Sequence, residues 1–459
     1  MRLAFRVPDT LVLLFGMMVL ALVATWLLPQ GAFQTVVNDA GRAVVVAGTY
    51  APVAEPRTLM PWALLTVVPR ALADAQDIIF FVLIVGGTIR VLRATGTIDA
   101  LLGSLLRQVG QSPGLLISLG MGVFAAGSAT LGVAEEYIPL TLVLIALCVA
   151  MRMDTVTAIG IMVCGYGIGY GVAALNPFTV LVAQRVAELP PASGMGFRLA
   201  IFLPFLAIGI HHVWRYARRV QADPRASLVH DVSSAQHEPV DLPEGMDGRH
   251  RVVAGMTLAA LGAMVYGIAV PKWYILELGA IFLALGLFAG LAGGLGANGT
   301  AKRFAEGASE LASTALLIGF ARSIALILED GQVLHTLVHA LASPLQAMGA
   351  QAAVVGMLAI QTVLNLFIPS GSGQAYVTMP LMAPIGDLVG ISRQTAVLAF
   401  QFGDGFANII VPTNPVLMGI LGIAGIPYDR WFRFVAPLLL KLFLAGSLAL
   451  LVALAVGLD

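Results

Sequence analysis

Gly127-Ser128-Ala129-Thr130 and Ser370-Gly371-Ser372-Gly373 each divide a long apolar run, 114–151 in the first case and 340–386 in the second. At a rise of about 1.5 Å per residue, the helical limbs on either side would be roughly 22 to 27 Å long. The hydrocarbon core of a membrane is about 30 Å thick, so these limbs are too short to cross it. The pattern predicts two re-entrant helical hairpins, which enter the membrane and turn back.

The turns of these hairpins are candidate binding residues. A Gly- and Ser-rich turn at membrane depth leaves backbone N–H and C=O groups without partners unless it is buried in protein or lines a cavity. We therefore predict that both tips border a binding site. In that site the hydroxyl groups of four residues would hold a carboxylate or a coupling cation: Ser128, Thr130, Ser370 and Ser372.

Composition places most of the chain in a membrane. Of its 459 residues, 59% are hydrophobic and 11% are charged, whereas soluble domains have about 25% charged residues. The formal net charge is zero, so there is no basic excess that would indicate a nucleic-acid partner. We expect a multi-pass protein of the bacterial inner membrane whose partners are the lipid bilayer and a small-molecule substrate.

Further apolar segments have the length of a spanning helix or of part of one. The first of them follows Arg2 and Arg6, as the apolar part of a signal peptide would, but no small-residue cleavage site comes after it. We therefore expect it to be retained as a spanning helix. The segments are 11–28, 78–89, 155–184, 199–214, 252–270, 273–295, 311–328, 394–427 and 434–458.

Arginine residues predict the orientation of the chain. They surround the one long polar segment, 221–249, which the positive-inside rule places in the cytoplasm. Counting spans outward from this segment puts the N-terminus in the cytoplasm and the C-terminus in the periplasm, and the two hairpins then open from opposite sides of the membrane. The arginines are Arg215, Arg218, Arg219, Arg225, Arg249 and Arg251.

The two halves of the chain resemble each other at an offset of about 240 residues. This ordered resemblance predicts an all-helical inverted-repeat transporter. Its parts would be a first repeat at 1–220, a cytoplasmic linker at 221–250, a connecting helix at 251–270 and a second repeat at 271–459, with hairpins at about 114–151 and about 350–386. Besides the hairpin tips, the aligned pairs are Asn176-Pro177 with Asn414-Pro415, Pro139 with Pro380, and Phe197-Arg198 with Phe432-Arg433.

Each Asn-Pro pair lies inside an apolar segment. Proline lacks a backbone N–H and clashes with the preceding turn, so we expect the helices to break at 176–177 and 414–415. Broken helices expose amides and carbonyls that bind anionic groups and cations. For a single pair a proline kink with a packing role would be the simpler interpretation. Two matching pairs favour binding by Asn176 and Asn414.

Three carboxylates lie inside apolar runs: Glu135, Glu136 and Asp404. A charge at mid-membrane costs at least about 2.5 kcal/mol on insertion scales, so such residues are functional by default. Adjacent positions on a helix point about 100° apart, so we expect one of the two glutamates to face the cavity. Neutral side chains near these motifs can add hydrogen bonds: Asn365, Gln374, Asn408 and Thr413.

Basic side chains are almost absent from the segments that carry these motifs. Apart from Arg152, no Lys, Arg or His occurs between 124 and 184, between 340 and 386 or between 394 and 428. Arg322 and Lys441 lie in other predicted spans. A buried dianion would need a cationic partner, so the pattern favours an amino acid over a dicarboxylate. It also suits a coupling proton or sodium ion at the same residues.

Four stretches of the sequence are typical of one transporter family: Phe5-Arg6-Val7-Pro8-Asp9-Thr10, Gly132-Val133-Ala134-Glu135-Glu136, Asn176-Pro177-Phe178 and Arg215-Tyr216-Ala217. They resemble the C4-dicarboxylate anaerobic carrier family, in its YfcC-like branch. The resemblance covers nearly the whole chain and implies the fold of the ion transporter superfamily: a homodimer with a scaffold domain, a moving transport domain that carries two hairpins, and an elevator mechanism. Members of this branch are often labelled basic amino-acid antiporters.

The hairpin tips differ from those of the sodium-coupled relatives, which carry Ser-Asn-Thr. Here the tips read Ser128-Ala129-Thr130 and Ser370-Gly371-Ser372, so the hydroxyl groups remain but the asparagine is absent. Coupling to a proton and coupling to sodium both stay open, and we expect no other cofactor and no bound metal.

We expect a secondary transporter for a small carboxylate-bearing solute, with a basic amino acid favoured and a C4-dicarboxylate as the alternative. A membrane-embedded enzyme is not expected, because the chain lacks the HExxH-type and Ser/His arrangements of membrane hydrolases.

Overall fold

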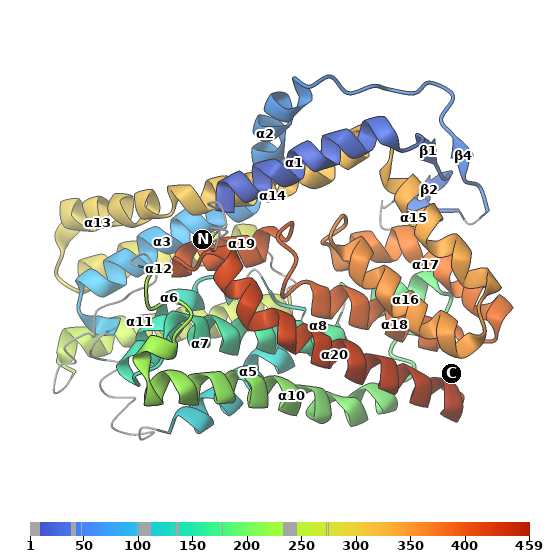
Figure 1. Cartoon of the computed structure of the whole chain (residues 1–459). Coiled ribbons are helices and arrows are strands. Elements are labelled where there is room, and N and C mark those ends of the chain that lie inside the picture. Colours follow the sequence, from blue (N-terminus) through green and yellow to red (C-terminus); the bar gives the residue numbers. More distant parts are fainter. Residues whose placement is uncertain are drawn as a thin grey trace, which may run out of the picture.

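The computed structural model describes residues 10–37, 43–46, 48–98, 100, 112–130, 132–134, 137–176, 178–232, 246–271, 273 and 275–459. This part of the chain is mostly helical, and many of the helices run roughly side by side (Figure 1). The first half contains α1 (Thr10–Leu27), α2 (Ala63–Asp74), α3 (Gln76–Ala94), α5 (Pro113–Thr130), α6 (Leu140–Ala150), α7 (Thr155–Ile159), α8 (Gly165–Gly171), α9 (Val180–Val186) and α10 (Met195–Ala222).

Each half contains one pair of consecutive helices that meet at a sharp bend. The bend between α2 and α3 is 61°, and the bend between α13 and α14 in the second half is 41°. The helices of the second half are α11 (Gly248–Ala269), α12 (Ile275–Ala292), α13 (Gly296–Glu310), α14 (Ala312–Asp330), α15 (Leu334–Ala342), α16 (Ala350–Asn365), α17 (Gly371–Val389), α18 (Arg393–Ala407), α19 (Pro415–Ala424) and α20 (Tyr428–Val456).

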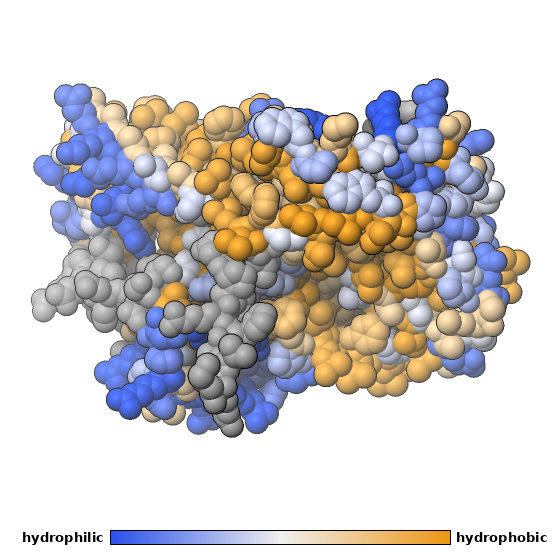
Figure 2. Space-filling view, turned by 45° about the horizontal axis from the view of Figure 1, so that its top comes forward, coloured by the Kyte–Doolittle hydropathy of each residue, from blue (hydrophilic) through white to orange (hydrophobic). Residues whose placement is uncertain are grey.

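The described helices have the composition of a multi-pass membrane protein. Three of them, α5, α10 and α20, are long and apolar enough to cross a membrane, and the number rises to five if the bent pairs α2–α3 and α13–α14 each count as one span. The first limb of the first predicted hairpin, α5, is therefore longer than predicted from the sequence, because its helix continues to Thr130. Figure 2 shows hydrophobic side chains in a broad band across the middle of the molecule, with hydrophilic side chains gathered at both ends. Such a band is what a lipid environment requires of the outer surface.

The helices pack in two groups. The α14 group consists of α1–α3 and α11–α14, and the α18 group consists of α5–α10 and α16–α20. α19 lies at the boundary between the groups, because it packs more extensively on α14 than on any helix of the α18 group. Within the α18 group the packing repeats: α5 contacts α8 and α10, whereas α16 contacts α18 and α20.

The centre of the α18 group is a close crossing of α8 and α18. A Cβ atom added at Gly405 would lie 2.3 Å from the backbone nitrogen of Gly171, so the two helices touch backbone to backbone. On the other side of α8, a Cβ at Gly169 would lie 2.3 Å from the carbonyl oxygen of Ala125 in α5. This tight packing places the end of α8, and the helix break that follows it, beside α18 of the other half.

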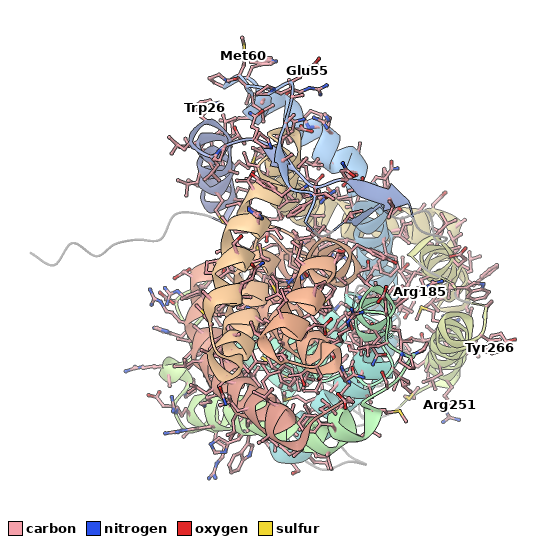
Figure 3. All side chains as sticks on the ribbon, turned by 90° about the vertical axis from the view of Figure 1, so that its right-hand side faces the viewer. Trp26, Glu55, Met60, Arg185, Arg251 and Tyr266 are labelled. Atoms are coloured by element: carbon pink, nitrogen blue, oxygen red, sulfur yellow. The ribbon has the colours of Figure 1, made fainter. Side chains whose placement is uncertain are left out.

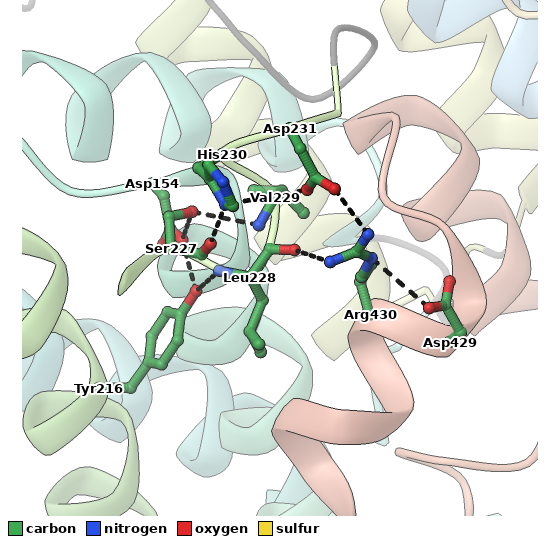
Figure 4. Close-up of polar contacts among 9 residues, drawn as sticks. All are labelled: Asp154, Tyr216, Ser227, Leu228, Val229, His230, Asp231, Asp429 and Arg430. Atoms are coloured by element: carbon green, nitrogen blue, oxygen red, sulfur yellow. Dashed lines mark hydrogen bonds and ion pairs between the residues drawn. The ribbon is translucent and has the colours of Figure 1, made fainter. Parts of the chain in front are cut away.

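The first part of the predicted linker 221–250 is packed on the α18 group (Figure 4). Asp154 caps α7 by accepting from the Thr157 N–H at 2.9 Å. The same carboxylate accepts from the hydroxyl groups of Tyr216 at 2.5 Å and Ser227 at 2.6 Å. One turn between α6 and α7 thus fixes both α10 and the chain that leaves it.

Arg430, at the start of α20, holds the next residues of this segment. Its guanidinium donates to the Leu228 carbonyl at 3.2 Å and to the Asp231 carboxylate at 2.8 Å. The pKa of Asp231 lies below its usual range, because the backbone N–H of Asp231 donates a hydrogen bond to the carboxylate and Arg430 is positively charged. The start of the linker therefore belongs structurally to the α18 group.

The loop 28–62 contains four short strands, which the all-helical prediction did not include. β1 (Gly31–Ala32) pairs antiparallel with β4 (Ala51–Pro52), and β2 (Thr35–Val37) pairs antiparallel with β3 (Ala43–Val45). The β-branched residues of β2 and β3 favour extended backbone. Trp26, Glu55 and Met60 lie together on the side of the molecule that carries this loop (Figure 3), and the Trp26 indole donates to the Leu59 carbonyl at 2.8 Å.

Histidines of α15 hold this loop against the rest of the protein. The Phe33 N–H donates to Nδ1 of His335 at 3.2 Å, and the ring of His339 stacks on Tyr50 with centroids 4.2 Å apart. The Tyr50 hydroxyl lies 2.9 Å from that of Thr336. His335 and His339, which lie four residues apart on one face of α15, are thus part of an aromatic contact between α15 and the loop.

We expect this contact to weaken in acid. Nδ1 of His335 accepts a hydrogen bond and must be unprotonated there, and burial lowers the pKa of His335. Its stabilising contribution is present above the unfolded-state pKa of about 6.5 and is lost as pH falls through the lower folded-state value. Hydrogen exchange of the peptide that contains Phe33, corrected for intrinsic rates, should show less protection at pH 5 than at pH 8.

Two variants serve as controls for this measurement. His335→Gln keeps an acceptor but does not titrate, so its protection should not change with pH. His339→Gln should keep the pH effect, because His339 makes the ring contact and not the hydrogen bond to Phe33. Equal protection of the wild-type peptide at both pH values would contradict this account.

Candidate functional site

A cavity of about 390 Å³ lies between the α14 group and the α18 group, at the N-terminal end of α17. Its two walls differ in chemistry. The wall from the α18 group carries neutral hydrogen-bonding residues, and the wall from α14 and the α2–α3 bend carries charges. Such a mixed polar cavity suits a small polar solute. The neutral residues are Ser370, Ser372, Asn408, Thr413 and Asn414, and the charged ones are Asp74, Arg322 and Glu329.

The start of α17 is the predicted second hairpin tip. Ser370 is its N-cap, and the Ser370 hydroxyl accepts from the Gly373 N–H at 3.3 Å. A Cβ atom at Gly371 would lie 2.5 Å from Cγ2 of Thr179 and 3.2 Å from Oδ2 of Asp404. Because residue 371 has no side chain, the tip can lie directly against the helix break of the first half and against Asp404.

Asn176 and Asn414 make the same local structure in the two halves. Oδ1 of Asn414 accepts from the N–H groups of Val416 and Leu417 at 2.9 and 3.2 Å, which caps α19. Oδ1 of Asn176 accepts from Phe178 and Thr179 at 2.8 and 3.1 Å. An asparagine at this position satisfies amides that the helix start leaves unpaired.

The remaining amide nitrogens of these asparagines connect each break to its surroundings. Nδ2 of Asn176 donates to the Ser128 carbonyl at 2.8 Å, which ties the first break to the first predicted tip. Nδ2 of Asn414 donates to Oδ1 of Asn408 at 2.8 Å. Both side chains therefore use their polar atoms to hold irregular backbone in place. A ligand would bind to the backbone groups and neighbouring residues that these asparagines position.

Asp404 is a fully buried carboxylate behind the second tip. Its Oδ1 accepts from Nδ2 of Asn365 at 2.9 Å and from Nδ2 of Asn408 at 3.3 Å. Its Oδ2 has no hydrogen-bond partner among the described residues. Burying a charge without a full set of partners is costly, so this oxygen is suited to a proton or a small cation.

Two further buried oxygen atoms near Asp404 also lack partners in the described part of the chain: Oδ1 of Asn365 and the hydroxyl of Thr179. Carboxylate, amide and hydroxyl oxygens are ligands that hard cations prefer. Asn365 is held in place by an amide network, because its Nδ2 also contacts Oε1 of Gln374 at 3.2 Å and Nε2 of Gln374 donates to Gln361 at 2.7 Å. Hydrogen bonds within the protein thus hold these side chains in place, while three of their oxygen atoms have no partner among the described residues.

The first predicted tip is built differently. Ser128 is fully buried, and its hydroxyl donates to the Val133 carbonyl at 2.7 Å. Thr130 donates to the Ala126 carbonyl at 2.7 Å and is exposed. The hydroxyl group of Tyr170 donates to the Gly132 carbonyl, and Gly132 lines the cavity. The predicted ligands Glu135 and Glu136, and Pro177, lie outside the described residues.

The structure thus divides the residues proposed from sequence into three sets. Ser370, Ser372, Asn408, Thr413 and Asn414 line the cavity. Asn365, Gln374 and Asp404 form a buried layer behind the tip of α17. Ser128, Thr130 and Asn176 are not on the cavity wall, and Ser128 and Asn176 act through their contacts with the first helix break.

Charged residues of the α14 group were not predicted as part of the site. Nε of Arg322 donates to Asp74 at 2.5 Å, and its Nη1 lies 3.6 Å from Glu329. Arg322 thus brings a cationic side chain to the cavity wall. It comes from α14, outside the segments in which the sequence has no cations. The spacing of Arg322 and Glu329 on one helix face, inside an otherwise apolar span, was the available signal.

Comparison with known proteins identifies the family. The family model for DcuC, described as C4-dicarboxylate anaerobic carrier, matches residues 7–455. The chain belongs to this family. A relative in Escherichia coli K12, YfcC, has the provisional name of a basic amino acid antiporter; it is 33% identical over 494 residues, which cover 99% of this chain and 97% of YfcC.

Other relatives of this carrier are more distant. An uncharacterized protein of Haemophilus influenzae is 26% identical, over 98% of this chain and 97% of that protein. Among solved structures, the YdaH transporter of Alcanivorax borkumensis has a TM-score of 0.44 at 18% identity, covering 98% of this chain and 99% of that chain. MtrF of Neisseria gonorrhoeae, described with a class of antimetabolite efflux pumps, has a TM-score of 0.41 at 16% identity, covering 98% and 95%.

The close approach at Gly371 gives a testable expectation for this carrier. Gly371→Ala adds a Cβ that must displace Thr179 or the tip, and overpacking of this kind costs about 1 to 3 kcal/mol. Transport in proteoliposomes should fall roughly tenfold or more, in proportion to that cost. Gly255→Ala in α11 is the matched control, because a Cβ there meets nothing within 4 Å. Undiminished transport by Gly371→Ala would show that the tip does not need this contact.

Proposed function

We propose that this carrier is a secondary active transporter of a small carboxylate-bearing solute, with a basic amino acid as the favoured substrate. Transport would be driven by an ion gradient or by exchange against a second solute. The family membership supports a transport role, and the provisional name of YfcC points to basic amino acids. The cavity between the two helix groups would be the place where the solute binds.

The buried carboxylate of Asp404 is the observation that carries this proposal. It lies behind the tip of α17, its Oδ2 has no partner among the described residues, and two more oxygen acceptors without partners belong to its neighbours. A proton or a sodium ion on Asp404 would remove the cost of the uncompensated charge. Because a Cβ atom at Gly371 would lie 3.2 Å from the same carboxylate oxygen, the occupancy of this site would bear directly on how the tip packs.

The two helix groups suggest how the site would gain access to both sides of the membrane. The α18 group carries the tips, the breaks and Asp404, and α19 of this group packs on α14. We propose that the α18 group moves as a transport domain against the α14 group as scaffold, in an elevator-type mechanism. The proposal includes a homodimer held together by the scaffold, opposite orientation of the two repeats, a cytoplasmic N-terminus and a periplasmic C-terminus in the bacterial inner membrane.

The charges around the cavity favour a solute with both signs of charge. Two carboxylates, of Asp74 and Glu329, and one guanidinium, of Arg322, line its charged wall, and Asp404 adds a further carboxylate behind the opposite wall. A basic amino acid offers one carboxylate for Arg322 and two cationic groups for the carboxylates of Asp74 and Glu329. The carboxylate of Asp404 would be neutralised by the coupling ion.

A C4-dicarboxylate is the alternative substrate, and the presence of Arg322 on the cavity wall is the observation that favours it. A dicarboxylate would require additional cations to neutralise the acidic residues of the site. Competition experiments separate the two substrates: arginine should inhibit uptake of a labelled basic amino acid and succinate should not, whereas the reverse result would identify the carrier as a dicarboxylate transporter.

Replacing Asp404 by Asn should uncouple the carrier. Asparagine is neutral and similar in shape, so the tip can still pack but no proton or sodium ion is required. A tenfold ion gradient stores about 1.4 kcal/mol, enough for about tenfold accumulation at one ion per solute. In proteoliposomes with an imposed proton or sodium gradient, Asp404→Asn should lose this accumulation and retain exchange of labelled L-arginine.

Asp387→Asn is the control for this experiment, because Asp387 lies at the exposed end of α17 and pairs with Arg393. It should accumulate solute as the wild type does. The role given to Asp404 would be refuted by an Asp404→Asn carrier that accumulates L-arginine as the wild type does under the same gradient.

A further inference from the structure

The charged wall of the cavity belongs to the helix group opposite the hairpin tip. Arg322, Ala325 and Glu329 line the cavity from α14, and their spacing of three and four residues places them on one helix face. Asp74 reaches the same wall from the end of α2, where the chain bends by 61° into α3. The fold therefore brings a guanidinium and two carboxylates to face the tip.

The guanidinium of Arg322 is held in a fixed orientation, but not all of its N–H groups have hydrogen-bond partners among the described residues. Its Nε donates to Oδ2 of Asp74 at 2.5 Å, which fixes the plane of the group. The nearest oxygen of Glu329 is 3.6 Å from Nη1, beyond hydrogen-bond distance, and no hydrogen bond from Nη1 or Nη2 to a described residue is present. About a third of the side chain remains exposed, at 31%. Arg322 lines the cavity, and its Nη1 and Nη2 groups make no hydrogen bond to a described residue. Guanidinium groups bind carboxylates through pairs of parallel hydrogen bonds, so these groups are suited to a solute carboxylate.

The rest of the cavity offers no equivalent group. The other described residues on its wall are neutral apart from Asp74 and Glu329, which repel a carboxylate. A solute carboxylate that enters the cavity therefore has one favourable ionic partner among the described residues, and that partner is already held in position by Asp74. This pre-orientation lowers the entropy cost of binding.

We propose that Arg322 binds the carboxylate of the transported solute and so makes the carrier select for that group, with Asp74 as the positioning residue. This inference rests on the proposed function and extends it: the specificity for a carboxylate resides in α14 of the scaffold, whereas coupling resides in Asp404 of the moving group. With the carboxylate on Arg322, Glu329 is left to face a cationic group of the same solute.

Arginine and agmatine provide a direct test, because agmatine is arginine without its carboxylate. Purified full-length carrier in proteoliposomes would be assayed for the concentration of each compound that half-inhibits uptake of labelled L-arginine. A charge-assisted hydrogen bond contributes about 1.5 to 3 kcal/mol, so the wild type should bind arginine roughly 10- to 100-fold more tightly than agmatine. Arg322→Gln should reduce this ratio to near one. The half-inhibiting concentration of arginine should rise, and that of agmatine should stay the same.

Two further variants separate binding from a structural role of Arg322. Arg70→Gln removes a neighbouring arginine of the same ion cluster, which pairs with Asp330 at 2.6 Å and is not on the cavity wall. It should keep the full preference for arginine. Asp74→Asn removes the same ion pair between α2 and α14 that Arg322→Gln removes but leaves the guanidinium, so it should also keep a clear preference.

The outcomes distinguish this inference from the proposed function. If the wild type prefers arginine and Arg322→Gln keeps that preference, or if Asp74→Asn loses it to the same extent, the inference is overturned while the transport function stands. If the wild type neither transports nor binds arginine or agmatine, the proposed substrate class fails, and the inference fails with it.

Discussion

The cost of irregular backbone and of buried charge inside a membrane protein is the constraint on which the rest of this structure depends. Neither a helix break nor a carboxylate can stay unpaired in a medium without water. Here each break is capped by its own asparagine, Asn176 or Asn414, and the surrounding amides of Asn365 and Asn408 satisfy one oxygen of Asp404. The second oxygen has no hydrogen-bond partner among the described residues, and in the proposed function it binds the coupling ion.

Close helix packing makes this arrangement possible. Gly405 and Gly169 let α8 lie directly against α18 and α5, which brings the break of the first half to the tip of the second. Gly371 completes the contact from the other side. The two halves therefore do not build two separate sites. They share one buried layer, with the cavity and the α14 wall in front of it. In the proposed function, the tip of α17 would lie between a solute in the cavity and an ion at Asp404.

Sequence patterns predicted the elements of this site better than their assembly. An apolar run broken by small polar residues located the tip at Ser370, and the Asn-Pro pairs located the breaks at Asn176 and Asn414. Both signals are local, because they depend on helix length and on proline chemistry. The inverted repeat that the offset between the halves predicts stays a prediction. Arg322 was set aside, since nothing in a single sequence shows that α14 faces the tip of α17. The strands in the loop 28–62 were also missed, because short β-branched runs give a weak signal.

A cysteine placed at the tip tests the central claim that the cavity between the two helix groups is the transport site. The native Cys148 and Cys164 are completely buried, so Ser372→Cys would supply the reactive thiol. The measurement is the rate of labelling by a membrane-impermeant maleimide, applied from either side of sealed vesicles with and without saturating L-arginine. The account requires labelling from both sides and a several-fold slower rate with arginine. A labelling rate that saturating arginine leaves unchanged, in a carrier that still transports it, would contradict the account.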